Sequence, residues 1–107
     1  MAIELHDVKS YLVELRLSRG SGLRALITLS LPDSKLATLS FYTSASDLTP
    51  AFKSSDGTRY GFSYHIHELP VMIDLLRNEK PITLVHETTS GVNSYIRSGF
   101  ETTGEGE

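Results

Sequence analysis

Residues 59–78 read RYGFSYHIHELPVMIDLLRN, and this stretch decides the fold. Over residues 59–67, aromatic or branched side chains alternate with small or polar ones, which is the pattern of a half-buried strand. The apolar residues then recur at helical spacing, and they predict an amphipathic helix over residues 69–79 with Pro70 in its first turn. The apolar face of the strand holds Tyr60, Phe62, Tyr64 and Ile66, and that of the helix holds Leu69, Met72, Ile73 and Leu76.

Before this stretch, the chain has the pattern of successive short strands. Residues 11–18 and 23–31 both alternate apolar with polar side chains, and the turn-forming residues 19–22 join them into a predicted hairpin. A third strand is expected over residues 36–43, and a weaker one near the N-terminus at residues 2–5. Strands this close in sequence pair antiparallel, so the first part of the chain is predicted to be a meander.

The segments before and after residues 59–78 differ from each other in composition. Residues 44–58 are rich in Ser, Asp and Gly and predict a long loop, with a short strand at 51–54 and a hairpin turn at Asp56–Gly57. After the helix, residues 82–87 and 92–98 have strand composition around a turn, and we expect them to form a second hairpin.

These elements predict one α+β domain over residues 1–99. It contains a mostly antiparallel sheet of six or seven strands, arranged as a meander, roll or half-barrel, with one amphipathic helix packed on it. Residues 100–107 carry three of the glutamates and are expected to form a disordered acidic tail. A sheet of this kind leaves an edge strand exposed, and exposed edges pair with other chains, so a homodimer formed through a sheet edge or face is expected.

Composition limits the chemistry. The 107 residues include no cysteine, which excludes disulfides and cysteine-ligated metals, and no motif for a cofactor is present, so none is expected. The net charge of −3 comes from the three acidic residues of the tail, so residues 1–100 lack the basic excess of a general nucleic-acid binder. With no membrane-spanning stretch and no signal peptide, we expect a soluble, cytoplasmic protein without a membrane partner.

The histidines define one candidate site. In a strand, His65 and His67 project from the same face together with Ser63, and this row is the predicted ligand-binding surface. Two imidazoles placed in this way could share a metal ion, with His86 as a third ligand, as in zinc sites that keep a position open for water. Two histidines at this spacing also occur by chance, and the simpler interpretation is an ordinary polar strand face.

The aromatic residues define a second candidate. Single-stranded nucleic acids stack their bases on sheet-borne aromatic rings beside basic side chains. Here such a surface would use Tyr60 and Tyr64 with Lys53 and Arg59. The alternation with Gly and Ser instead favours burial of these rings beneath the helix, so nucleic-acid binding is possible but not favoured.

Three classes of function therefore remain after the sequence alone. The first, which we favour, is a non-catalytic interaction or assembly module that forms a homo-oligomer. The second is a single-stranded nucleic-acid-binding module. The third is a metal-dependent enzyme that uses the His-x-His pair of His65 and His67. The sequence contains no catalytic motif, and we assign no catalytic residue.

Overall fold

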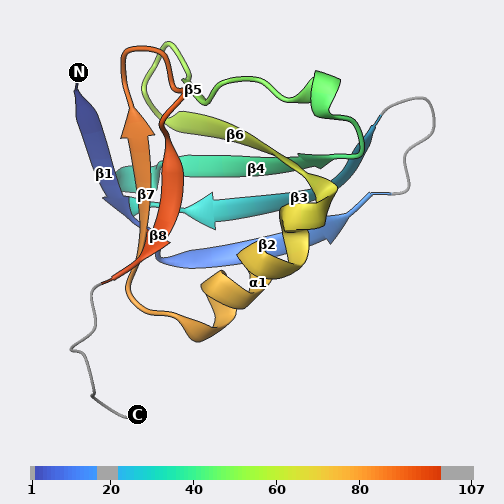
Figure 1. Ribbon diagram of the computed structural model, residues 1–107. Coiled ribbons are helices and arrows are strands. Elements are labelled where there is room, and N and C mark those ends of the chain that lie inside the picture. The colour runs from blue at the N-terminus through green and yellow to red at the C-terminus, as the bar shows by residue number, and fades with distance from the viewer. Residues whose placement is uncertain (1, 17–21, 100–107) are drawn as a thin grey trace.

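The computed structural model describes residues 2–16 and 22–99, and in these residues the chain is an α+β protein with two sheets and one α-helix (Figure 1). This confirms the predicted fold class. The strands are β1 (Ile3–Asp7), β2 (Ser10–Leu15), β3 (Leu23–Ser30), β4 (Leu36–Tyr42), β5 (Phe52–Lys53), β6 (Arg59–His65), β7 (Ile82–Glu87) and β8 (Tyr95–Ser98). The helix α1 spans Leu69–Asn78 and follows a 3₁₀ turn at Ile66–Glu68.

The larger sheet has five strands in the order β2-β3-β4-β6-β5. The predicted hairpins β2–β3 and β5–β6 and the antiparallel pair β3–β4 are present. The pairing of β4 with β6 is parallel, and it is the one parallel pair among the described strands of this mostly antiparallel sheet. The long connection of residues 43–58 allows this arrangement, because it carries the chain back to the start of β4 before β6 begins.

The smaller sheet has three strands in the order β1-β7-β8, all antiparallel. The sequence predicts that the N-terminal strand belongs to the meander, and this is wrong. β1 pairs with β7 instead, from Ile3 opposite Glu87 to Asp7 opposite Thr83. The described part of the chain thus has eight strands rather than six or seven.

The core lies between the two sheets and the helix, where β3 and β4 contribute its centre. Alternate residues of these strands are fully buried, which agrees with the period of two in their sequences. Met72 and Leu76 of α1 are buried against the sheet, and Leu69, Ile73 and Leu75 pack around them. The helix therefore covers the core as its apolar stripe predicts, and the buried residues of β3 and β4 are Ala25, Ile27, Leu29, Ala37, Leu39 and Phe41.

Two further expectations concern the ends of elements. The helix begins at Leu69 as predicted and ends at Asn78, one residue early. The last two residues of the predicted strand 11–18, residues 19–21 of the predicted turn 19–22 and the predicted acidic tail at 100–107 lie outside the described residues. No helix within residues 2–16 and 22–99 is long and apolar enough to cross a membrane.

Candidate functional site

The strand β2 forms one edge of the larger sheet (Figure 1), and five of its six residues are exposed. The sequence predicts one buried face for it, but of its apolar residues only Val13 packs against the core. Leu15 is 78 % exposed and Leu12 is 61 % exposed, and these two side chains project from opposite faces of the sheet. The edge of β2 therefore presents an exposed leucine on each face of the sheet.

The backbone of β2 shows which residues face outward. The N–H of Arg16 donates to the carbonyl of Arg24 at 2.7 Å, which continues the register that pairs Leu15 with Ala25. In an antiparallel ladder the bonded residues alternate, so the even-numbered residues of β2 bond to β3. The N–H and C=O groups of Tyr11, Val13 and Leu15 consequently point away from β3, toward the free edge.

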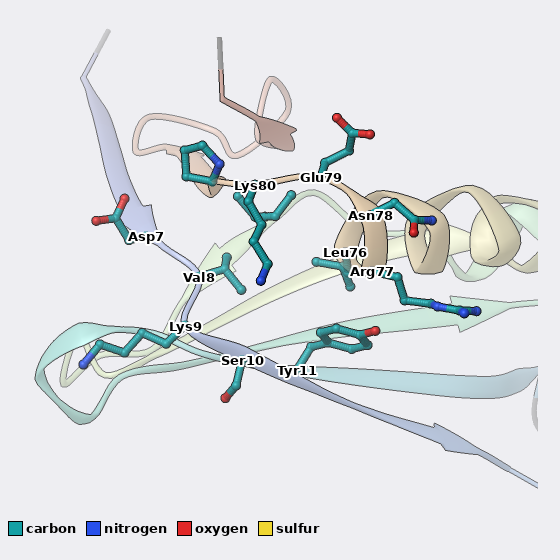
Figure 2. Close-up of a pocket in the computed structure, with 12 residues that line it drawn as sticks. Asp7, Val8, Lys9, Ser10, Tyr11, Leu76, Arg77, Asn78, Glu79 and Lys80 are labelled. Atoms are coloured by element: carbon teal, nitrogen blue, oxygen red, sulfur yellow. The ribbon is translucent and has the colours of Figure 1, made fainter. Parts of the chain in front are cut away.

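A groove of about 1040 Å³ lies at the start of β2, between residues 7–11 and residues 76–82 (Figure 2). Tyr11 belongs both to this groove and to the edge of β2. Three basic and two acidic side chains line the groove, so it does not select a ligand of one charge. The charged residues of its lining are Lys9, Arg77, Lys80, Asp7 and Glu79.

Ser63 and His65, predicted to form part of a ligand-binding row, hold the long loop in place. The Ser63 hydroxyl donates to the carbonyl of Thr49 and accepts from its N–H, both at 2.8 Å. The Nε2 atom of His65 lies 3.1 Å from the carbonyl oxygen of Thr43. Both side chains thus use their polar atoms on the backbone at the two ends of the segment 43–49.

The structure brings together only two of the three predicted metal ligands. His67 lies in the 3₁₀ turn rather than in the strand; its N–H donates to Nδ1 of His65, and the two rings are 4.3 Å apart. His86 packs against the rings of Tyr60 and Phe62, on the opposite face of β6 from His65. Within the described residues, no three His, Cys, Asp or Glu side chains are placed to hold a metal ion.

The residues predicted for nucleic-acid binding do not form one surface. Tyr60 is 2 % exposed, and Tyr64 stacks on the core residue Phe41 with ring centroids 5.5 Å apart. Burial raises the pKa of the Tyr64 hydroxyl to about 12, and the charge of Glu68 adds to this effect. Both tyrosine rings therefore lie in or against the core, as the alternation of these aromatic residues with Gly and Ser favours. Arg59 is exposed at the start of β6.

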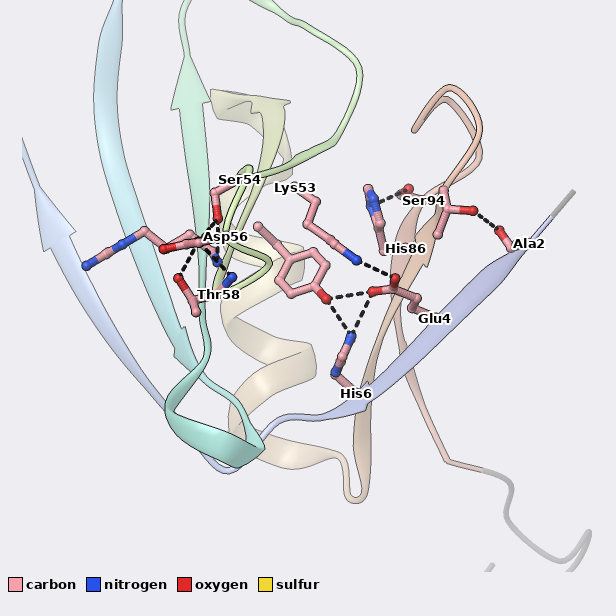
Figure 3. A network of polar contacts seen from close by, with 12 residues as sticks. Ala2, Glu4, His6, Lys53, Ser54, Asp56, Thr58, His86 and Ser94 are labelled. Carbon is pink, nitrogen blue, oxygen red and sulfur yellow. Dashed lines mark hydrogen bonds and ion pairs between the residues drawn. The ribbon is translucent and has the colours of Figure 1, made fainter.

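Lys53 takes part in a polar network between the two sheets (Figure 3). The Glu4 carboxylate accepts hydrogen bonds from Lys53 Nζ and from the Tyr60 hydroxyl, both at 2.6 Å, and lies 3.3 Å from His6 Nε2. The Lys53 and Tyr60 bonds lower the pKa of Glu4 to about 2. Burial raises the pKa of Tyr60, and its bond to Glu4 raises it further. The network links β1 to β5 and β6, and so joins the small sheet to the large one.

His86 and Glu87, at the end of β7, are also satisfied within the fold. Burial lowers the pKa of His86 and so favours its neutral form, and its Nδ1 lies 3.4 Å from the Ser94 hydroxyl. Backbone N–H groups of Ser90 and Thr89 lower the pKa of Glu87 to about 2. These residues hold the β7–β8 turn in its conformation.

The edge of β2 is therefore the candidate functional site, because the side chains of Leu12 and Leu15 are exposed and its outward backbone groups have no partner shown within the described residues. No function is predicted for these residues from the sequence. The signal was nevertheless there: Tyr11, Leu12 and Val13 are consecutive apolar residues in a strand, which a strand with one solvated face does not have. Comparison with protein-family models, with curated proteins and with solved structures finds no match to this chain.

Proposed function

We propose that this protein is a non-catalytic assembly module that pairs with a second copy of itself through the free edge of β2. The observation that carries the proposal is that β2 combines an open backbone edge with apolar side chains on both faces. Proteins that stay monomeric protect such an edge with charges, proline or a covering element. In β2, only Glu14 provides a charge of this kind.

A two-fold axis through Val13 gives a consistent pairing. It places Val13 opposite the partner's Val13 and Tyr11 opposite the partner's Leu15, so that all three outward-facing residues of each copy form ladder hydrogen bonds. Their side chains lie on the core side of the sheet and meet there as apolar cross-strand pairs. A register displaced by two residues would place Glu14 opposite the partner's Glu14, and like charges at that position are unfavourable.

The test is the mass in solution of two variants at the same position. Val13→Pro removes an outward N–H without touching the ladder to β3, whereas Val13→Ala trims the side chain and keeps that N–H. By light scattering at about 100 μM chain, above the micromolar Kd of weak interfaces, the wild type should have at least twice the 11.8 kDa mass of one chain. Val13→Ala should keep this mass and Val13→Pro should halve it.

Two results would contradict the proposal. A wild-type mass of 11.8 kDa under these conditions would show that the edge remains unpaired. An unchanged mass for Val13→Pro would show that the copies associate without β2. Circular dichroism of each variant shows whether it is folded, and Leu15→Lys provides a second variant, since this exposed side chain can be replaced with little effect on the core.

A further inference from the structure

The two ends of β2 differ in what surrounds their side chains. Tyr11 and Leu15 project from the core side of the sheet, as does Val13, which packs against the core. Leu15 is 78 % exposed, so its side chain lies mostly in solvent. Tyr11 is 36 % exposed and lines the groove between residues 7–11 and 76–82. One end of the strand therefore carries a protruding apolar side chain, and the other end borders a groove.

The part of the groove beside Tyr11 is suited to an apolar side chain. Figure 2 shows the Tyr11 ring beside Leu76 and Arg77 of α1. Leu76 is only 6 % exposed, and the exposed Arg77 has a methylene stem that can cover an apolar group while its guanidinium stays in water. Because Tyr11 belongs to the edge strand, this part of the groove lies next to the free edge of the sheet.

The proposed pairing about Val13 brings the protruding end of one copy to the groove of the other. Tyr11 lies opposite the partner's Leu15, with their Cβ atoms about 5.5 Å apart and both side chains on the core side. The partner's Leu15 thus reaches the groove where Leu76 and Arg77 line it. The two-fold axis repeats this contact, so each copy both gives and receives a leucine.

We infer that the groove beside Tyr11 receives Leu15 of a second copy. The inference rests on the proposed pairing of β2 and adds to it a contact between the strand of one copy and α1 of the other. A leucine fills only a small part of a groove of about 1040 Å³, so the contact uses the part beside Tyr11.

The same contact favours one register of the two strands. In the register displaced by two residues, in which Glu14 faces the partner's Glu14, the partner's Leu15 lies opposite Val13 instead of Tyr11. Its side chain then lies one repeat of the strand, about 7 Å, from the groove. Burial of Leu15 and the repulsion between the glutamates therefore both select the pairing about Val13.

A double-mutant cycle between Leu15 and Arg77 tests the inference. Within one chain about 14 Å of strand separates Leu15 from Tyr11, beside which Arg77 lies, so these two residues can contact each other only between copies. Sedimentation equilibrium gives the Kd of the dimer for each variant. Leu15→Ala should raise this Kd at least about thirtyfold, because both copies lose a buried leucine.

The effect of Arg77→Ala should depend on whether Leu15 is present. In the wild type it should raise the Kd about fivefold, since two equivalent contacts are lost, and in Leu15→Ala it should change the Kd less than about twofold. Leu12→Ala is the matched control, because it trims the other exposed leucine of β2 on the opposite face of the sheet. In that background Arg77→Ala should keep its full fivefold effect.

The possible results separate this inference from the proposed function. If Val13→Pro abolishes the dimer but Arg77→Ala has no effect, or has equal effects with and without Leu15, the strands pair and the groove does not receive Leu15. A monomeric wild type, or a dimer that Val13→Pro leaves intact, would contradict the pairing of β2 and the inference together. If Leu15→Ala associates too weakly to be measured, Leu15→Val takes its place in the cycle, and circular dichroism shows that each variant is folded.

Discussion

At the scale of single residues, Glu4 connects the two sheets by charge. Its carboxylate holds Lys53 and the Tyr60 hydroxyl, and these bonds lower its pKa to about 2 from an ordinary value of 4.5. The ionised form is thus favoured in the folded state. Its stabilising effect is complete above the ordinary pKa and is lost as the pH falls from about 5 to 2.

Glu4→Gln tests this effect. Glutamine keeps one acceptor for Tyr60 but removes the charge that holds Lys53, so at pH 7 the free energy of unfolding should fall by about 1–2 kcal/mol, as for one hydrogen bond to a charged group. Near pH 2.5 the difference from the wild type should shrink, because this pH lies well below the ordinary pKa of Glu4 and close to its lowered pKa in the folded state, so most of the stabilising effect of the charge is already lost. Urea unfolding at both pH values measures this. A difference that stays the same at low pH would show that the charge of Glu4 is not what stabilises the fold.

Gly91 occupies a position that other residues cannot adopt. Its φ is +77°, and a Cβ atom there would lie 1.9 Å from the carbonyl oxygen of Ala51. Gly57 has the same φ, but its Cβ would meet only Lys53 Cε at 3.8 Å. The two glycines therefore separate backbone strain from a steric clash.

Replacing each glycine by alanine compares the loss of stability at the two positions. Gly57→Ala should cost about 1–2 kcal/mol of stability for the left-handed conformation alone. Gly91→Ala should cost more than Gly57→Ala, because the loop of residues 88–94 must also move away from Ala51. Thermal unfolding of both variants measures the difference. Equal costs would mean that the contact between Gly91 and Ala51 does not constrain the fold.

At the scale of elements, the sequence predicts best what depends on neighbouring residues. The alternation in β3, β4 and β6 identifies their buried faces, and the spacing of Leu69, Met72 and Leu76 identifies both α1 and the face that it buries. The parallel pair β4–β6 and the pair β1–β7 could not be predicted in this way, because periodicity shows which face of a strand is buried but not which strand lies beside it.

The same limit explains why the sequence alone does not identify the contacts of Ser63 and His65 or the free edge of β2. The row of Ser63, His65 and His67 assumes that the strand continues to His67, but the chain turns into a 3₁₀ conformation at Ile66. The loop that Ser63 and His65 hold lies more than ten residues away in sequence, so local patterns do not reveal it. The free edge of β2 likewise follows from the strand order, which depends on the whole sheet.

The helix provides a prediction at this scale. Leu76 is 6 % exposed and lies against the sheet, whereas Val71 is 66 % exposed on the opposite side of α1. Leu76→Ala should reduce the free energy of unfolding by about 2–4 kcal/mol through lost burial and the resulting cavity. Val71→Ala should change it by less than about 0.5 kcal/mol. Similar effects of the two substitutions in urea unfolding would mean that α1 is not docked as described.

At the scale of the whole molecule, the described chain has one well-packed centre and, at β2, an edge strand with exposed apolar side chains. The polar residues that suggested chemistry are used within the fold: Glu4 joins the sheets, Ser63 and His65 hold a loop, and His86 is buried. The exposed side chains of Leu12 and Leu15, and the outward backbone groups of β2, have no such use shown within the described residues. This division between satisfied polar groups and open apolar surface is what favours assembly over catalysis.

Amide hydrogen exchange along β2 tests the central claim most directly, because it reports on each backbone N–H separately. At about 100 μM chain, above the micromolar Kd of weak interfaces, pairing predicts that the outward N–H groups of Tyr11, Val13 and Leu15 exchange slowly. Those of Leu12 and Glu14, which bond to β3, should be slow at every concentration, and dilution should speed up exchange at the three outward residues only. Fast exchange at Tyr11, Val13 and Leu15 at high concentration, with Leu12 and Glu14 still protected, would contradict the account, because it would show that the edge stays open to water.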